Sequence, residues 1–290
     1  MKKLGLMYII LASVLWGTSG IFVHYMAPFG FTSLQMTFIR AIVSFLCMGV
    51  YVLIKDKRLV KTNLKESLLF LLGGFSFYMT ATCYYYSMQL TSISTAVVLM
   101  YTAPIFVMIY STTFLGEKLT PMKLISVAGM IVGCGLVSGI IGGMKFDVVG
   151  ILVGFMSGIS YAIYNIVTKI EMQKGINPIK ANFYCFLFAV IGGAILSEPL
   201  GIIDCIRNNP PVTIPLSIGL GVVTCILPYF TYTMALRELP AGTASSLGIL
   251  EPMAATIYSV LIFGEKISIY SFAGIILILA SVIILGRQKQ

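Results

Sequence analysis

Ten runs of mostly apolar residues, each close to the length of a membrane-spanning helix, take up almost the whole chain. A transmembrane helix needs about 20 consecutive apolar residues. Only 10% of the 290 residues are charged and 58% are hydrophobic, whereas about 25% of the residues in a soluble domain are charged. We therefore predict an all-α integral membrane protein with ten transmembrane helices, near residues 4–26, 32–54, 67–88, 93–115, 121–140, 149–168, 179–197, 214–236, 242–263 and 270–286.

The segments between these runs are too short to hold a soluble domain, and the chain lacks the motifs of common enzymes. It has a single histidine, and neither an HExxH zinc motif nor a GxxxxGK[ST] phosphate-binding loop occurs. Its six cysteines include no CxxC pair, and five of them fall inside the runs, where buried apolar positions suit them better than a metal or redox site. We therefore expect no enzyme activity, no metal site and no cofactor.

Positive charge is distributed unevenly between the two sides that these helices would separate. If the N-terminus lies in the cytoplasm, fifteen of the 19 Lys and Arg residues fall on cytoplasmic segments, three fall on outer segments, and Arg40 falls within a helix. An excess of Lys and Arg marks the cytoplasmic side. We therefore expect a multi-pass protein of the cell membrane with both termini in the cytoplasm. The net charge of +9 then reflects topology and does not indicate a nucleic-acid partner.

An internal repeat relates the two halves of the chain. GEKL at 116–119 recurs as GEKI at 264–267, an offset of 148 residues, and at an offset of 145 residues the second apolar run lines up weakly with the seventh. Further matches at the offset of 148 residues are Tyr84 with Tyr232, Thr95 with Thr243, Ala96 with Ala244, and Pro104 with Pro252. The matches predict two five-helix repeats.

We place the first repeat at residues 1–140 and the second at residues 141–290. Because five is an odd number, the second repeat would enter the membrane from the opposite side. Inverted repeats of this kind are found in many secondary transporters, and their substrates bind near the membrane midplane where the halves meet. The predicted architecture is thus one membrane domain with a 5+5 inverted repeat.

Four features of the sequence are specific enough to compare with known families, namely WGTSGIFV (16–23), the lone Arg40, YTAPIFVMIYSTTFLGEKLT (101–120) and LEPMAATIYSVLIFGEKIS (250–268). Together they resemble the EamA family of the drug/metabolite transporter superfamily. The paired P-x11-GEK arrangement is the most specific part of the resemblance, which extends over the whole chain. It implies a ten-helix secondary carrier with a central cavity, often an exporter of amino acids or other small metabolites.

Glu251 is the single Asp or Glu that falls in the interior of a predicted helix, and Ala103 stands opposite it in the first repeat. An acid at membrane depth costs about 2.5–3.5 kcal/mol on insertion scales unless it meets water or a partner. We therefore expect Glu251 to face a central cavity, where it could couple transport to protons by taking one up and releasing it. Two structural alternatives stay open: Glu251 caps a kink at Pro252, or it pairs permanently with Arg40.

Arg40 is the lone basic residue inside a predicted helix, and Cys185 stands at the matching position of the second repeat. The planar guanidinium group can hold a carboxylate through two parallel hydrogen bonds. We therefore predict that Arg40 binds an anionic group of the substrate. It could also extend its charge to the membrane surface or tie helix ends together.

Several aromatic and polar side chains fall well inside the predicted helices. Trp16 aligns with Tyr161 at the offset of 145 residues, and Asn165 follows Tyr161 by one helical turn. These side chains would form a semi-polar wall that suits amino acids, small aromatic compounds or weak organic cations. Alternatively, their polar groups bond neighbouring helices to one another. The candidate wall residues are Trp16, Tyr78, Thr82, Tyr101, Tyr161 and Asn165.

Pro104 and Pro252 occupy equivalent positions in the two repeats. Proline in the middle of a helix removes a backbone donor and leaves a carbonyl group free for a neighbour or a ligand. We therefore expect a helix kink at each proline, either as a packing feature or as a hinge.

These features together predict a secondary active transporter that works by alternating access. The expected substrate is a small metabolite, such as an amino acid or a related compound, and the expected direction is export. The proton is the candidate coupling ion. The other expected partner is the lipid bilayer. One alternative is a carrier of nucleotide sugars or phosphate esters, which would need several cationic groups in the cavity. Another is a non-coupled membrane channel or binding protein, which would not need Glu251.

Overall fold

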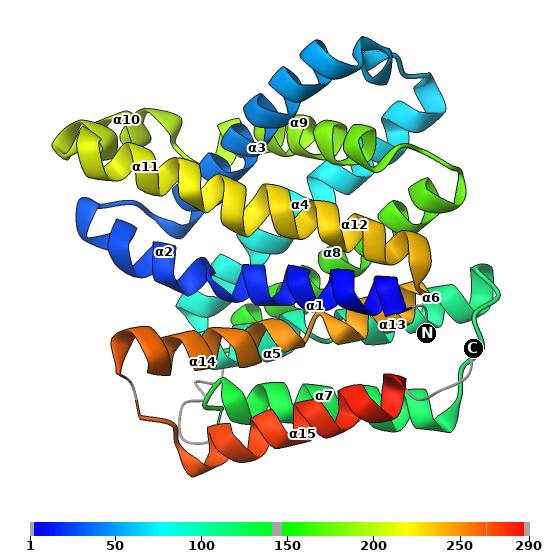
Figure 1. The fold of residues 1–290 in the computed structure, drawn as a ribbon. Coiled ribbons are helices and arrows are strands. Elements are labelled where there is room, and N and C mark those ends of the chain that lie inside the picture. Colours follow the sequence, from blue (N-terminus) through cyan, green and yellow to red (C-terminus); the bar gives the residue numbers. More distant parts are fainter. Residues whose placement is uncertain (1–2, 141–146, 265, 287–290) are drawn as a thin grey trace.

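The computed structural model describes residues 3–140, 147–264 and 266–286, and every regular element in these ranges is a helix (Figure 1). Eight helical segments are long and apolar enough to cross a membrane, namely Lys3–Phe29, Ser33–Lys55, Leu64–Leu90, Thr95–Phe114, Val148–Gln173, Pro178–Leu196, Pro210–Glu238 and Ala241–Phe263. Two shorter apolar helices are Pro121–Val137 and Ile269–Leu285. The all-α membrane protein is confirmed, while the count of ten spans stays a prediction.

Several of these segments contain more than one helix. In chain order the α-helices are α1 (Lys3–Gly17), α2 (Ser19–Met26), α3 (Ser33–Lys55), α4 (Leu64–Leu90), α5 (Ile93–Met100), α6 (Ala103–Phe114), α7 (Pro121–Val137), α8 (Val148–Gln173), α9 (Pro178–Leu196), α10 (Pro199–Asn208), α11 (Pro210–Gly221), α12 (Leu227–Glu238), α13 (Ala241–Leu247), α14 (Leu250–Phe263) and α15 (Ile269–Gly286). Short 3-10 turns cover Ala27–Phe29 and Lys57–Val60, and a π-helical turn over Val222–Ile226 joins α11 to α12.

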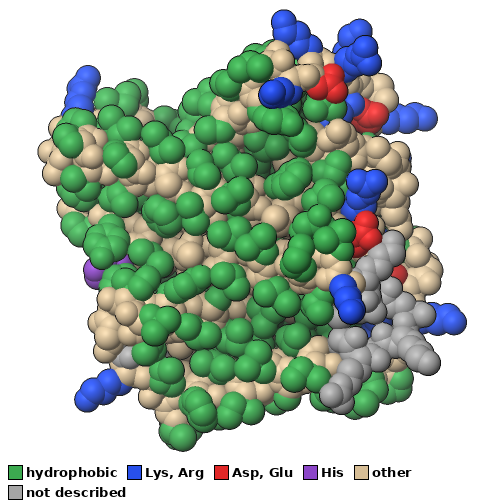
Figure 2. Space-filling model, in the orientation of Figure 1, with side chains coloured by type: hydrophobic (Ala, Val, Ile, Leu, Met, Phe, Trp, Pro, Cys, Tyr) green, Lys and Arg blue, Asp and Glu red, His purple; other side chains and the backbone are tan. Residues whose placement is uncertain are grey.

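Four helix pairs make up most of the bundle. α4 lies along α8, α3 along α9, α1 along α12, and α7 along α15 (Figure 1). The α7–α15 pair packs closely because Gly133 and Gly274 face each other, and a Cβ added at either glycine would lie within 3 Å of the other's carbonyl oxygen. Apolar side chains cover most of the visible face of the bundle (Figure 2). Such a surface suits contact with lipid chains.

Basic side chains gather at one end of the bundle, which we call the basic end (Figure 2). Here α1, α4, α7, α9 and α13 begin, and α3, α6, α8 and α12 end (Figure 1). The opposite end carries Arg207, at the end of α10, and Lys266, after α14. Which end faces the cytoplasm stays a prediction.

Pro104 and Pro252 lie at helix breaks and do not kink continuous helices, contrary to the expectation. α6 begins one residue before Pro104, and α14 begins two residues before Pro252. The first N–H groups of a helix have no acceptor within it, so proline in this turn removes no hydrogen bond. Turn hydrogen bonds continue through the breaks, from the Ile105 N–H to the Thr102 carbonyl oxygen at 2.9 Å and from the Glu251 N–H to the Gly248 carbonyl oxygen at 3.0 Å.

The two GEK segments form turns, as their sequences suggest. Gly116 and Gly264 both have a φ of 68°, in the left-handed region that glycine tolerates best. Thr120 and Ser268 then cap the next helix, because each side-chain oxygen accepts the backbone N–H three residues further on. The repeated motif therefore produces the same local structure twice.

The helix α8 extends beyond its predicted end at residue 168 and reaches Gln173. This extension places Glu171 within an apolar helical segment, where its side chain is only 4% exposed. The expectation that Glu251 is the single acid inside a span is therefore wrong. Hydropathy falls at Lys169, but the helix itself continues to the turn at Gly175, where φ is 73°.

Candidate functional site

Glu251 lies where two broken helices meet. The hydroxyl group of Tyr101, at the break between α5 and α6, donates a hydrogen bond to Oε2 of Glu251 at 2.8 Å. It also lies 3.5 Å from the carbonyl oxygen of Gly248, at the break between α13 and α14. Because Glu251 is the second residue of α14, the partial positive charge at the helix start favours its carboxylate.

The candidate wall residues Trp16, Tyr161 and Asn165 are linked to this meeting point. The amide nitrogen of Asn165 donates to the carbonyl oxygen of Tyr161 at 2.6 Å, and Asn165 Oδ1 accepts from the hydroxyl group of Tyr232. The ring of Tyr232 lies 5.2 Å from the indole of Trp16. Tyr161 in turn lies close to the break between α13 and α14, because a Cβ added to Gly248 would lie 3.5 Å from the Tyr161 hydroxyl oxygen. Contacts therefore run from α1 through α12 and α8 to the break before Glu251.

Tyr229 on α12 is the centre of an aromatic cluster beside these residues. Its ring centroid lies 5.0 Å from that of Trp16, 4.9 Å from Phe77 and 5.6 Å from Tyr164. All three rings meet it edge to face, the arrangement that aromatic quadrupoles favour. The cluster joins α1, α4, α8 and α12. Phe77 was absent from the residues considered from the sequence, and Tyr164 and Tyr229 were not distinguished from other tyrosines.

Trp16 and Arg40 each carry a polar group without a hydrogen-bond partner in the described part of the chain. The indole nitrogen of Trp16 is buried and unpaired, and an N–H group in that state costs about 1–3 kcal/mol. Arg40, half-buried on α3, makes no ion pair or hydrogen bond with a described residue, although its charge acts on Tyr229 and Glu251. Arg40 and Glu251 are thus not held as an ion pair.

Tyr78 packs in the same core as Trp16, Tyr101 and Tyr161, and Thr82 follows it by one helical turn. Both are buried on α4, and the Thr82 hydroxyl donates to the Tyr78 carbonyl oxygen at 3.0 Å. The ring of Tyr78 packs on Gly193 of α9, where an added Cβ would lie 2.7 Å away. Helix packing accounts for these two contacts, while the buried hydroxyl group of Tyr78 has no hydrogen-bond partner in the described part of the chain. Tyr78 and Thr82 as wall residues stay a prediction.

A turn between α12 and α13 is held from both sides at the basic end. Lys169 Nζ donates to the carbonyl oxygens of Leu236 and Leu239 at 2.7 and 2.6 Å. Oε1 of Glu117, from the first GEK turn, accepts the N–H of Ala241 at 2.6 Å. This contact between the two halves of the chain is not predictable from the GEK motif itself.

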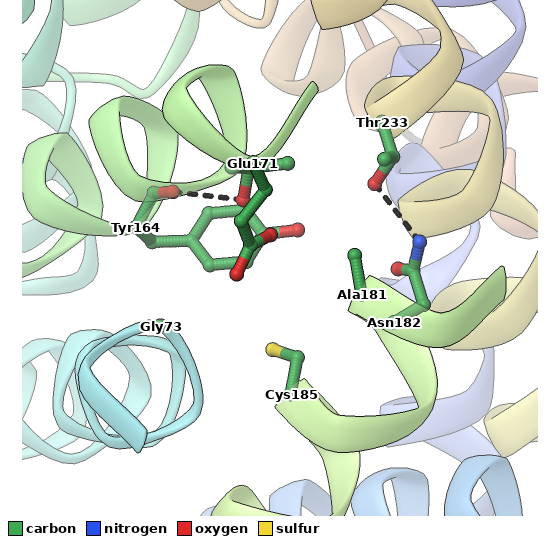
Figure 3. Close-up of a pocket in the computed structure, with 8 residues that line it drawn as sticks. Gly73, Tyr164, Glu171, Ala181, Asn182, Cys185 and Thr233 are labelled. Atoms are coloured by element: carbon green, nitrogen blue, oxygen red, sulfur yellow. Dashed lines mark hydrogen bonds between the residues drawn. The ribbon is translucent and has the colours of Figure 1, made fainter. Parts of the chain in front are cut away.

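A small cavity lies near the same end, between α4, α8, α9 and α12 (Figure 3). Its volume is about 10 Å³, close to the minimum for one water molecule. The residues that line it are Gly73, Tyr164, Thr168, Glu171, Ala181, Asn182, Cys185 and Thr233. None of these residues was a candidate from the sequence, because Glu171 and its neighbours fall at or beyond the predicted helix ends or look like ordinary packing residues.

Comparison with known proteins identifies the kind of protein that carries this arrangement. A model of the EamA-like transporter family matches residues 3–139 and 148–287. An uncharacterized transporter of Archaeoglobus fulgidus is 28% identical and covers 97% of this chain and 95% of its own length. An uncharacterized transporter of Clostridium kluyveri is 27% identical over 100% of this chain and 95% of its own. The uncharacterized transporter YwfM of Bacillus subtilis is 25% identical, with shares of 98% and 94%.

A solved crystal structure shares the fold, with a TM-score of 0.80 and 16% sequence identity over 97% of this chain and 95% of that chain. The family match covers both halves of the chain, and the helices have the length and composition of membrane spans. The chain therefore belongs to the EamA-like transporter family of the drug/metabolite transporter superfamily and is a multi-pass membrane transporter.

Proposed function

We propose that this transporter is a secondary carrier that moves a small metabolite by alternating access, with ten spans arranged as two inverted repeats, 1–140 and 141–290. The observation that carries the proposal is the hydrogen bond between Tyr101 and Glu251, which joins two helix breaks at equivalent positions of the repeats. Broken helices near the midplane expose backbone groups and dipole ends to a substrate or coupling ion. The basic end would face the cytoplasm of a cell-membrane exporter.

The substrate class that best suits these residues is a zwitterion of amino-acid size. Arg40 and the indole N–H of Trp16 are donors without partners among the described residues, and they suit a carboxylate. Glu251 offers one carboxylate, which suits an ammonium group. The cluster around Tyr229 supplies aromatic faces that suit an apolar or aromatic side chain. A phosphate ester would need more positive charge than Arg40 alone supplies.

Glu251 also supports the proposal of proton coupling. Its carboxyl group can hold either a proton or the substrate ammonium group, so the two cations compete for one site. Competition of this kind links the proton affinity to the substrate affinity, and linkage is what a coupled carrier requires. Trp16, Tyr101, Tyr161 and Asn165 would position the groups around it.

The test is a thermal-stability screen of the purified protein in detergent. The panel contains amino acids, their carboxamides, the corresponding decarboxylated amines, and sugar phosphates. A ligand at 100 times its Kd stabilises the folded state by about 2.7 kcal/mol. We expect amino acids to raise the melting temperature most, because they alone use both Arg40 and Glu251.

Arg40→Ala should abolish the preference for amino acids over their carboxamides, whereas Arg207→Ala, at an exposed arginine on α10, should leave it unchanged. Stabilisation by sugar phosphates alone would replace this proposal with a phosphate-ester carrier. If a folded Arg40→Ala variant kept the preference for amino acids over their carboxamides, Arg40 would not be part of the binding site.

A further inference from the structure

Glu171 is a second acid in the membrane-spanning part of the protein, and the proposed transport mechanism does not use it. Its side chain is 4% exposed near the basic end of α8. Within the described ranges, its carboxyl group makes no hydrogen bond or ion pair. Burial of an unpaired carboxylate is very costly, whereas burial of the neutral carboxylic acid is much less so. The surroundings of Glu171 therefore favour a bound proton.

The carboxyl group points into the small cavity between the four helices (Figure 3). The side-chain donors of Asn182 and Thr168 nearby are already in use. Nδ2 of Asn182 donates to the Thr233 hydroxyl oxygen at 3.0 Å and to the Pro178 carbonyl oxygen at 2.9 Å. The Thr168 hydroxyl donates to the Tyr164 carbonyl oxygen at 2.9 Å. What these side chains still offer are oxygen acceptors, which suit an O–H group of a neutral carboxyl or a water.

The other groups around the cavity do not supply a counter-charge. The titratable groups that face Glu171 are Tyr164 on α8 and Cys185 on α9, while α4 and α12 contribute Gly73 and Thr233. On the same helices, Lys180 pairs with Glu66, and Lys169 donates to the end of α12. The volume of about 10 Å³ also excludes a metabolite, which needs a pocket of roughly 300 Å³ or more.

We propose that Glu171 is a proton-binding site, separate from Glu251, that keeps its proton while α8 and α12 are closed and releases it to water when they part. The geometry links the two events, because Lys169 holds the end of α12 only two residues before Glu171. On opening, water enters the cavity, the carboxyl O–H bond breaks, and the proton passes to that water. Closure of the basic end would then be linked to pH, whatever the substrate is.

Infrared difference spectroscopy of the purified protein tests the proposal, because the carbonyl stretch of a protonated carboxyl group is separate from the bands of a carboxylate. Spectra are compared during a pH titration in sodium-free buffer, for the unmodified protein and for Glu171→Gln, Glu171→Asp and Glu251→Gln. We expect Glu171→Gln to lose a protonated-carboxyl band at neutral pH, Glu171→Asp to shift it, and Glu251→Gln to keep it. The same band should disappear as the pH rises, with a fall in melting temperature that Glu171→Gln lacks.

The absence of any band assignable to Glu171 at neutral pH would overturn the proposal. So would removal of the band by sodium at constant pH, because the site would then bind a metal cation in place of a proton. If Glu171→Gln does not fold, Glu171→Asp decides: the band must shift in that variant and must stay in place in Glu251→Gln.

Discussion

The two helix breaks of the transporter, between α5 and α6 and between α13 and α14, have similar backbone arrangements and different side chains. The break between α5 and α6 carries Tyr101 and Ala103, and the matching positions, 148 residues later, are Ile249 and Glu251. Each break therefore has one polar and one apolar member, and the polar members bond to each other across the breaks. Ala103 and Ile249 are fully buried. The two interruptions thus differ in that one carries the hydrogen-bond donor and the other carries the acceptor.

The strongest test of the comparison asks whether the two repeats are inverted in the membrane. Lys118 and Lys266 occupy the same position in the two GEK turns. Lys118→Cys and Lys266→Cys, each made in a variant without the native cysteines, are labelled in intact cells with a membrane-impermeant maleimide. We expect full labelling at residue 266 and none at residue 118. Equal labelling of both would contradict the inverted arrangement and the assignment of the basic end to the cytoplasm.

The next largest effect should come from removing the charge that only the second break carries. Glu251→Gln keeps the shape of the side chain and cannot ionise. In proteoliposomes, uptake driven by a pH gradient should fall by about 5–150-fold, the range for a coupling free energy of roughly 1–3 kcal/mol. Substrate exchange without a gradient should persist but need a higher substrate concentration, because the neutral amide no longer pairs with the ammonium group.

Asp204→Asn, at an exposed acid on α10, serves as the matched control and should transport normally. If Glu251→Gln retained full gradient-driven uptake, its carboxyl group would have a structural role, and the difference between the two breaks would not concern coupling.

A smaller effect is expected from removing the donor that only the first break carries. Tyr101→Phe leaves Glu251 without the hydroxyl group that now lies 2.8 Å from it. The loss of a hydrogen bond to the half-buried carboxyl group of Glu251 should lower the free energy of unfolding by about 1–3 kcal/mol, measured by thermal unfolding in detergent. Tyr86→Phe, at a half-exposed tyrosine of α4, should change it much less. An equal effect of the two changes would mean that the bond across the breaks does not stabilise the protein.

The smallest effect should come from the feature that both breaks share. Pro104 and Pro252 lie in the first turns of α6 and α14. Replacing either proline by alanine there mainly increases the conformational entropy of the unfolded chain. Pro104→Ala and Pro252→Ala should each lower stability by less than about 1 kcal/mol. A loss several times larger for one of them would show that this proline determines the break on its side.

The sequence was sufficient for the all-helical membrane class, for most helix limits and for the GEK turns, since these depend on long apolar runs and on local turn chemistry. It did not reveal the breaks at Tyr101 and Gly248. An interrupted helix in an apolar core has the same composition as a continuous one, and the partners that satisfy its free groups come from the other half of the chain.

The missed site residues have similar causes. Tyr229 resembles many other tyrosines in the spans, and its central position depends on rings from three other helices. Glu171 follows Lys169, so the drop in hydropathy indicated a loop, although the helix continues for another turn. Glu117 bonds to Ala241 through a contact between distant parts of the chain. Local patterns contain no information about such pairings.

The turn held by Lys169 and Glu117 has a consequence for the kinetics of transport. If its hydrogen bonds favour the closed basic end by even about 1.4 kcal/mol, ten molecules are closed there for each that is open. A solute arriving from that side then has an apparent affinity reduced by the open fraction. The turn would make substrate binding from the basic end slower than substrate binding from the opposite end. A substitution that loosens it would change the direction of fastest flux without altering any group beside Glu251.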